Sequence, residues 1–228
     1  MQALKYLNDL AFSLDGYSTE TSFFRKDSFN NVVSTIKSLP EWTNNLSLIF
    51  TLHKKNYKYY SKMRELALNL GVRYNFSLFT TPHSETTAAF EIDDNDILFL
   101  MRSFETDSIE ILDSSLSNWI GCRDCCGAGS TLLSITANGD VLPCHMFFDR
   151  EFSKGNALTV SLDQVFSDDT PMFSVHEKSK CHTCNIRYIC GGGCLFRSYI
   201  SRKCFEDTDP LCPMYSSGIR KKLMALIG

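Results

Sequence analysis

The chain has 228 residues, of which 43% are hydrophobic and 12% aromatic, so it can bury one substantial core, or one core and a smaller module. Its formal net charge of −3 and pI near 6.0, without a long run of Lys or Arg, argue against nucleic acid or an anionic membrane as partner. The sequence shows neither a signal peptide nor an apolar stretch of about 18 residues, so we expect a cytoplasmic protein.

The first part of the chain predicts alternating strands and helices. A helix capped by Ser28 is predicted to stop before Pro40, and a second helix over 57–71 ends at a glycine. The order strand, helix, strand, helix, strand favours a parallel sheet with right-handed crossovers. The predicted strands are 7–14, 46–52 and 72–80.

Residues 81–96 follow as a polar loop, and 97–105 and 108–120 are predicted to be helical. A parallel sheet is normally covered on both faces and protected at its edges. Because the strand at 7–14 would leave an edge open, we expect that a further segment belongs in front of it.

All ten cysteines lie between Cys122 and Cys212. In a reducing compartment, clustered cysteines are metal or cluster ligands more often than disulfides. The sequence therefore predicts two domains, a cysteine-free one over 1–120 and a cysteine-rich one over 121–228.

The cysteine-rich part begins with a predicted hairpin around Asn138-Gly139, which would return Cys144 toward Cys126. A short helix is predicted over 161–166, and the closing segment 218–228 reads as an amphipathic helix.

The densest motif is Cys181-x2-Cys184-x5-Cys190-x3-Cys194, with Cys212 18 positions later. A metal centre needs about four thiolates at ~2.3 Å from its metal atoms, and a CxxC turn supplies two. Eight ligands fit two tetrads, so two centres are implied. Iron–sulfur clusters are the favoured interpretation, and structural zinc sites built from thiolates are the alternative.

The order of these cysteines resembles the SPASM domain, a family that binds two auxiliary [4Fe-4S] clusters. Residues 12–16 ("FSLDG"), 23–39 and 49–56 ("IFTLHKKN") look like the second half of the radical S-adenosylmethionine (SAM) barrel that precedes SPASM in peptide- and protein-modifying maturases. The resemblance implies an α/β fold: a half β/α barrel of parallel strands, then a small iron–sulfur domain.

The same resemblance implies how the ligands divide. Three ligands of the inner cluster correspond to Cys126, Cys144 and Cys194, and its fourth is Cys122 or Cys125. Cys204 has no assigned role and is predicted to be a free thiol. The ligands implied for the outer cluster are Cys181, Cys184, Cys190 and Cys212.

For SAM itself, the family places residues corresponding to Ser13, Asp15 and Arg25 near the pocket, although "SLDG" also fits a plain turn and Arg25 a surface charge. The family's CxxxCxxC motif and its glycine-rich motif are both missing from this sequence. If residues 7–14 are the family's fourth strand, half of the barrel precedes Met1. We therefore expect no SAM cleavage by this chain unaided.

In one branch of the family, the anaerobic sulfatase-maturing enzymes, an aspartate directly follows the cysteine corresponding to Cys144 and acts as a base. This chain has His145 there, which can also accept a proton near neutral pH. We nevertheless favour a ribosomal-peptide maturase, which forms thioether or carbon–carbon crosslinks, over a sulfatase maturase.

Several other side chains have plain structural interpretations. The Phe pairs in "SFF" and "MFF" are predicted to be core rather than a peptide-binding surface. Histidines predicted to lie at the surface or in loops are His53, His83, His176 and His182.

Two hypotheses follow. In the first, the chain is the C-terminal portion of a radical SAM/SPASM maturase that modifies a peptide or protein and takes electrons from a donor such as ferredoxin or flavodoxin. Its cofactors are two [4Fe-4S] clusters, and SAM once a missing N-terminal half is supplied. In the second, it is a noncatalytic iron–sulfur or zinc module that binds or transfers electrons with a partner chain.

Overall fold

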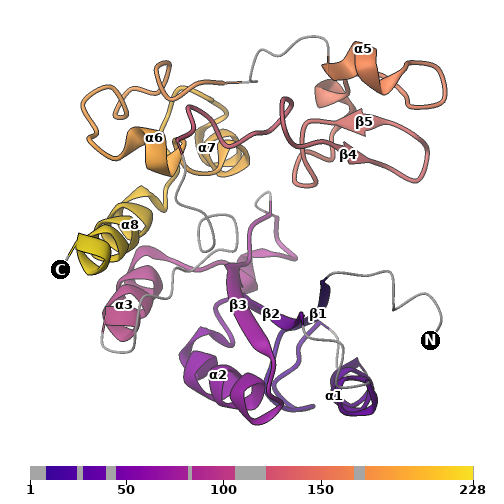
Figure 1. Ribbon diagram of the computed structural model, residues 1–228, viewed down its shortest axis with the longest axis vertical. Helices are drawn as coiled ribbons and strands as arrows, with labels where there is room; N and C mark the ends of the chain where they lie inside the picture. The colour runs from indigo at the N-terminus through magenta and orange to yellow at the C-terminus, as the bar shows by residue number, and fades with distance from the viewer. Residues whose placement is uncertain are drawn as a thin grey trace. The chain divides into compact units, whose positions relative to one another are not determined.

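The computed structural model describes residues 9–24, 28–39, 45–81, 84–105, 122–166 and 173–227. It divides into two compact units, Met1–Asn118 and Trp119–Gly228, and each is considered by itself (Figure 1). Within the described ranges, no helix has the length and apolar character needed to cross a lipid bilayer.

The first unit contains a three-stranded parallel sheet in the order β1-β2-β3. Its strands are β1 (Leu10–Leu14), β2 (Leu46–Leu52) and β3 (Arg73–Leu78). In the register of the sheet, Leu14 lies opposite Phe50, which lies opposite Phe76. The predicted parallel arrangement is confirmed.

Two helices make the crossovers between these strands, as Figure 1 shows. Helix α1 (Ser28–Ser38) contacts β1, and α2 (Tyr60–Asn69) contacts β2 and β3. A short 3-10 turn, η2 (Tyr57–Tyr59), leads into α2. Helix α2 is followed by Gly71, whose φ of 67° is the left-handed conformation that commonly ends helices.

The two faces of the sheet differ in character. On one face, alternate residues such as Leu48, Phe50 and Leu52 are fully buried. The other face carries short polar side chains: Ser13 is exposed, and the hydroxyls of Thr51 and Ser77 lie 3.4 Å apart. In a barrel, residues that face the interior alternate with residues that face outward, so the two faces of a strand have different surroundings.

After β3 come a 3-10 turn, η3 (Ala88–Phe90), and helix α3 (Asp94–Glu105). Asp93 caps α3, because its Oδ1 accepts the N–H groups of Asn95 and Asp96. The helix predicted over 97–105 is thus confirmed, while the one predicted over 108–120 lies outside the described residues.

The second unit begins with a small antiparallel hairpin of β4 (Ser134–Ile135) and β5 (Val141–Leu142). Gly139 in its turn has φ 88°, as the Asn-Gly dipeptide predicts. The remaining elements are η4 (Arg150–Phe152), α5 (Leu162–Phe166), α6 (Arg187–Cys190), α7 (Leu195–Arg202) and α8 (Cys212–Ile227).

A compact aromatic core holds the second unit together. Phe147 is only 1% exposed and packs edge-on against Phe196 of α7, 5.2 Å between ring centroids. Its other neighbours include Phe152, and Leu195 and Cys144 belong to the same buried cluster. The core therefore joins the loop after the hairpin to α7.

Two sequence predictions need correction here. Of the Phe pairs predicted to be core, only Phe147 is buried, whereas Phe23 and Phe24 are 38% and 47% exposed and Phe148 is 75% exposed. The closing helix was predicted over 218–228, but α8 begins earlier, at Cys212. The chain enters this helix shortly after the buried Asp209.

Candidate metal-cluster site

The glycine triplet between α6 and α7 brings three chain segments close together. All three residues have positive φ (67°, 81° and 75°). A Cβ on Gly191 would lie 2.6 Å from the carbonyl oxygen of Cys125, and one on Gly193 would lie 2.6 Å from Cβ of Asp209. Only glycine fits both requirements, and the triplet therefore fixes the backbone between Cys190 and Cys194.

Backbone N–H groups point at several of the sulfur atoms. Cys144 Sγ accepts the N–H of Met146 at 3.3 Å. Burial raises the pKa of Cys190, and the N–H groups of Gly192 and Gly193 oppose that rise by stabilising the thiolate. Such N–H donors are the hydrogen bonds that stabilise thiolate ligands and tune iron–sulfur clusters.

One group of thiols lies around the start of α8. Burial raises the pKa of Cys181, and negative charge on Cys212 and Cys184 raises it further. Burial likewise raises the pKa of Cys190, with contributions from Cys212 and Cys181. These side chains are therefore electrostatic neighbours, and the name outer set is used for Cys181, Cys184, Cys190 and Cys212.

A second group lies around the hairpin and the start of α7. Burial raises the pKa of Cys194 to about 11, Arg197 opposes the rise, and charge on Asp209 and Cys126 adds to it. Burial raises the pKa of Cys144, and charge on Cys126 contributes there too. The name inner set is used for Cys126, Cys144 and Cys194.

A buried ion pair anchors the inner set to the segment before α8. Asp209, 2% exposed, pairs with Arg197 at 2.9 Å and accepts the backbone N–H of Cys194 at 2.7 Å. It also accepts the N–H of Leu211 at 2.9 Å, next to Cys212. Arg197 further contacts the hydroxyl of Tyr215 in α8.

The donor set fits an iron–sulfur cluster. Across the part of the chain that the structure describes, no three His, Cys, Asp or Glu side chains are close enough to hold a single metal ion. Cysteine thiolates are the usual ligands of [4Fe-4S] clusters. Buried thiols with N–H donors aimed at sulfur suit such a cluster.

The remaining cysteines and His145 belong to neither set. Cys122 is exposed, and Cys125 is partly buried with its Sγ 3.9 Å from Ser130 Oγ, so both remain candidates for the fourth inner ligand. Cys204 is partly buried. His145 is exposed directly after Cys144.

In the first unit, the residues expected near SAM lie after the carboxyl end of β1 or within it. Ser13 is exposed on the polar face. Asp15 is 3% exposed, with Oδ2 accepting the N–H of Phe24 at 2.6 Å and with Oδ1 buried and unpartnered. Arg25 lies outside the described residues.

His53 was predicted to lie at the surface or in a loop; it follows β2 but is completely buried. Phe24 and Phe90 pack edge-on against its ring, at 5.1 and 5.2 Å. Burial lowers its pKa to about 4, its Nδ1 accepts the N–H of Lys55, and its Nε2 is buried without a hydrogen-bond partner. Its place at the carboxyl edge of a parallel strand, where ligands bind in such sheets, was the signal in the sequence. His176 and His182 are exposed, as predicted, and His83 lies outside the described residues.

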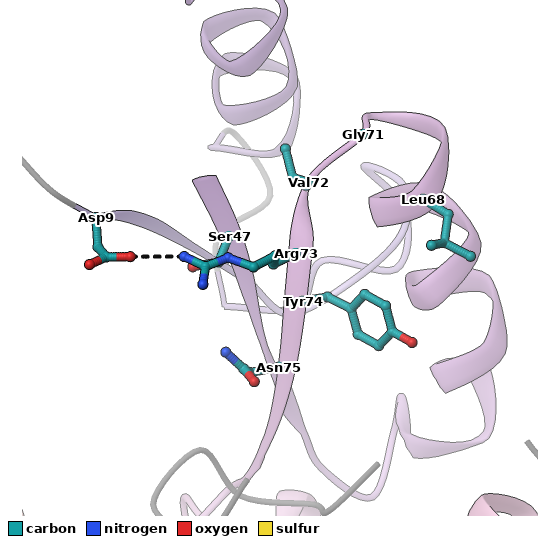
Figure 2. Close-up of a pocket in the computed structure, with 8 residues that line it drawn as sticks. All are labelled: Asp9, Ser47, Leu68, Gly71, Val72, Arg73, Tyr74 and Asn75. Carbon is teal, nitrogen blue, oxygen red and sulfur yellow. Dashed lines mark hydrogen bonds and ion pairs between the residues drawn. The ribbon is translucent and has the colours of Figure 1, made fainter. Parts of the chain in front are cut away.

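A separate cavity of about 740 Å³ lies at the opposite end of the sheet (Figure 2). It is lined by residues at the amino ends of the strands, among them Ser47, Tyr74 and the ion pair of Asp9 with Arg73, 2.8 Å apart. In β/α barrels this end supports stability, and the carboxyl end carries the chemistry. The cavity is therefore not the candidate site.

Both units define a recognisable class: a partial parallel β/α barrel followed by a cysteine-rich cluster domain. Residues 121–185 match the family model of the SPASM domain, an iron–sulfur cluster-binding domain. This segment of the second unit is thus similar to a SPASM domain, and the fold of the chain is similar to that of the solved structures below. No curated protein matches the sequence.

Solved structures with this fold include "Native anSMEcpe with bound AdoMet", 14% identical, with a TM-score of 0.70 over 99% of this chain and 70% of that one. Another is SuiB of Streptococcus suis bound to S-adenosylmethionine, 21% identical, with a TM-score of 0.58 over 89% of this chain and 53% of that one. SuiB bound to its precursor peptide SuiA also matches, at 21% identity and a TM-score of 0.54, over 87% of this chain and 52% of SuiB. This chain therefore spans between about half and 70% of the length of these structures.

Proposed function

We propose that this chain is the C-terminal portion of a radical SAM/SPASM maturase and that it holds two auxiliary [4Fe-4S] clusters. The observation that carries the proposal is that one unit holds partly or fully buried thiols, of which Cys144 and Cys190 have backbone N–H donors at sulfur. The SPASM match over 121–185 supports it.

The outer set supplies four thiolates to one cluster. The inner set supplies three to the other, with Cys122 or Cys125 as its fourth. Because Cys194 follows the glycine triplet directly after Cys190, adjacent cysteines of one motif serve different clusters. Cys194 would thereby connect the hairpin to the C-terminal segment through the inner cluster. Asp209, which pairs with Arg197 and accepts the N–H of Cys194, fixes the position of Cys194.

When bound, the clusters supply one-electron chemistry, and SAM supplies the radical that abstracts hydrogen from the substrate. The chain's own residues bind, position and accept protons. Ser13 and Asp15 are proposed to line the SAM site together with Arg25. Exposed His145 is proposed to accept a proton from the substrate, for which a neutral imidazole is suited.

The proposed substrate is a peptide or a protein segment. Support comes from SuiB bound to SuiA and from anSMEcpe bound to a peptide called Cp18Cys. This anSMEcpe chain is 13% identical, with a TM-score of 0.66 over 95% of this chain. Ferredoxin or flavodoxin is proposed as electron donor, and the cytoplasm as location.

The second candidate is a noncatalytic cluster module that acts with a partner chain. It is favoured by one observation, the lack of a CxxxCxxC motif in the printed sequence. To separate the two candidates, the reconstituted chain is mixed with the proposed upstream half as a second polypeptide. SAM and dithionite are then added, and 5′-deoxyadenosine is measured. Formation of 5′-deoxyadenosine supports the first, and cluster binding without it supports the second.

The primary test is anaerobic reconstitution followed by iron, sulfide and zinc quantification. We expect about eight irons per chain, falling to about four in Cys184→Ala or Cys144→Ala. Cys204→Ala is the matched control and should keep them all. One or two zinc ions with negligible sulfide would contradict the proposal and leave a zinc-stabilised interaction domain.

A further inference from the structure

Lys178 is a buried lysine whose Nζ has neutral hydrogen-bond acceptors among the described residues. The residue is only 2% exposed. Its Nζ donates hydrogen bonds to Ser198 Oγ at 2.8 Å and to the backbone oxygen of Asp207 at 3.1 Å. Both acceptors are neutral. In the described ranges, no carboxylate oxygen lies within ion-pair distance of this Nζ, and a buried charge is costly unless an opposite charge compensates it.

The nearest buried carboxylate is already committed. Asp209 pairs with Arg197, so these two charges cancel. Burial lowers the pKa of Lys178, and negative charge on Asp209, Cys181, Cys126 and Cys194 opposes that effect. Cysteine sulfur atoms of both sets are therefore among the groups whose negative charge would favour the charged form of Lys178.

Backbone and side-chain contacts connect Lys178 with both thiol sets. Its carbonyl oxygen accepts the N–H of Cys181 at 3.0 Å, which places it one turn before the outer set. Its stem runs along the glycine triplet, where a Cβ on Gly192 would lie 3.0 Å from its Cδ. Ser198, the acceptor of its Nζ, donates in turn to the carbonyl oxygen of Cys194 at 3.3 Å.

We propose that Lys178 is a shared cation of the two clusters, raising the reduction potential of both. The inference rests on the proposed function, since it assumes that both thiol sets hold clusters. Each reduction adds one electron, taken from dithionite in the test below, and no proton. The added negative charge is stabilised by a fixed cation in a low-dielectric interior.

The test compares the potentials of wild type, Lys178→Met and Lys178→Arg after reconstitution of the full chain. Methionine keeps the length of the stem and removes the charge, whereas arginine keeps the charge. Lys203→Met is the matched control, because Lys203 is an exposed lysine of the same unit, over the ring of Tyr199. Iron and sulfide are quantified first, and each cluster is then titrated with dithionite and followed by EPR spectroscopy.

We expect Lys178→Met to shift both midpoint potentials to more negative values, and Lys178→Arg and Lys203→Met to stay close to wild type. Loss of iron in Lys178→Met with retention in Lys178→Arg would also support the proposal. Unchanged potentials, a shift of one cluster alone, or loss of iron in both Lys178 variants would overturn it. Wild-type protein without iron would instead contradict the proposed function, so the two failures are distinguishable.

Discussion

At the residue scale, Gly193 combines two constraints that can be separated by mutation. Its φ of 75° costs an alanine about 1–2 kcal/mol, and the added Cβ would also lie 2.6 Å from Asp209. We expect Gly193→Ala to lower the free energy of unfolding by more than about 2 kcal/mol and to reduce iron retention.

Gly71→Ala is the matched control, because Gly71 has φ 67° and nothing within 4 Å of an added Cβ. Its cost should be limited to the φ penalty of about 1–2 kcal/mol, as chemical denaturation would measure. Equal costs at the two positions would show that the contact with Asp209 is unimportant.

His53 predicts a pH dependence of the first unit. Its pKa is lowered by burial from 6.5 to about 4, so the unfolded chain takes up a proton more readily than the folded one. The neutral ring contributes stability above about pH 6.5, and that contribution is lost as the pH falls toward 4. It amounts to at most about 3 kcal/mol.

Urea unfolding between pH 4 and pH 7 measures this dependence. His53→Phe keeps an aromatic ring between Phe24 and Phe90 but does not titrate, so its stability should vary less over the same interval. The same slope in wild type and variant would assign the effect to other groups.

At the scale of elements, hydrogen bonds from the Asn156 side chain stabilise the hairpin, whose strands have only two residues each. Its Nδ2 donates to the carbonyl oxygen of Asn138 and to Asp140 Oδ1, and its Oδ1 accepts the N–H of Leu158. Because the hairpin positions Cys144, we expect Asn156→Ala to destabilise the unit by about 1–3 kcal/mol and to lower the iron held by the inner set. Thr159→Ala, in the same loop, should leave iron content unchanged, and an equal loss in both variants would contradict the role of Asn156.

The elements also show what the sequence could predict. The apolar run was sufficient for β2, whose bounds were predicted to the residue, and Asn138-Gly139 was sufficient for the hairpin turn. The division of the cysteines into two ligand sets was implied by the family resemblance and stays a prediction. Pattern alone could not predict the burial of His53 or Lys178, because long-range packing of Phe24, Phe90 and Gly192 creates their surroundings.

At the scale of the whole molecule, all cysteines belong to Trp119–Gly228, and the parallel sheet belongs to Met1–Asn118. Removing iron should therefore lower the unfolding temperature of the second unit and leave that of the first unchanged, since ligand binding stabilises only the fold that contains the site. Calorimetry of the full chain before and after chelation measures both transitions. A common shift of both would show that the units unfold together.

The glycine triplet also has a consequence for the gene. Every change at the first or second base of a glycine codon replaces the glycine, and positions 191 to 193 all have positive φ and neighbours that a Cβ would meet at 3.0 Å or less. Nearly every single-base substitution in this stretch that alters the protein should therefore be harmful. Silent third-base changes are the variation that it tolerates.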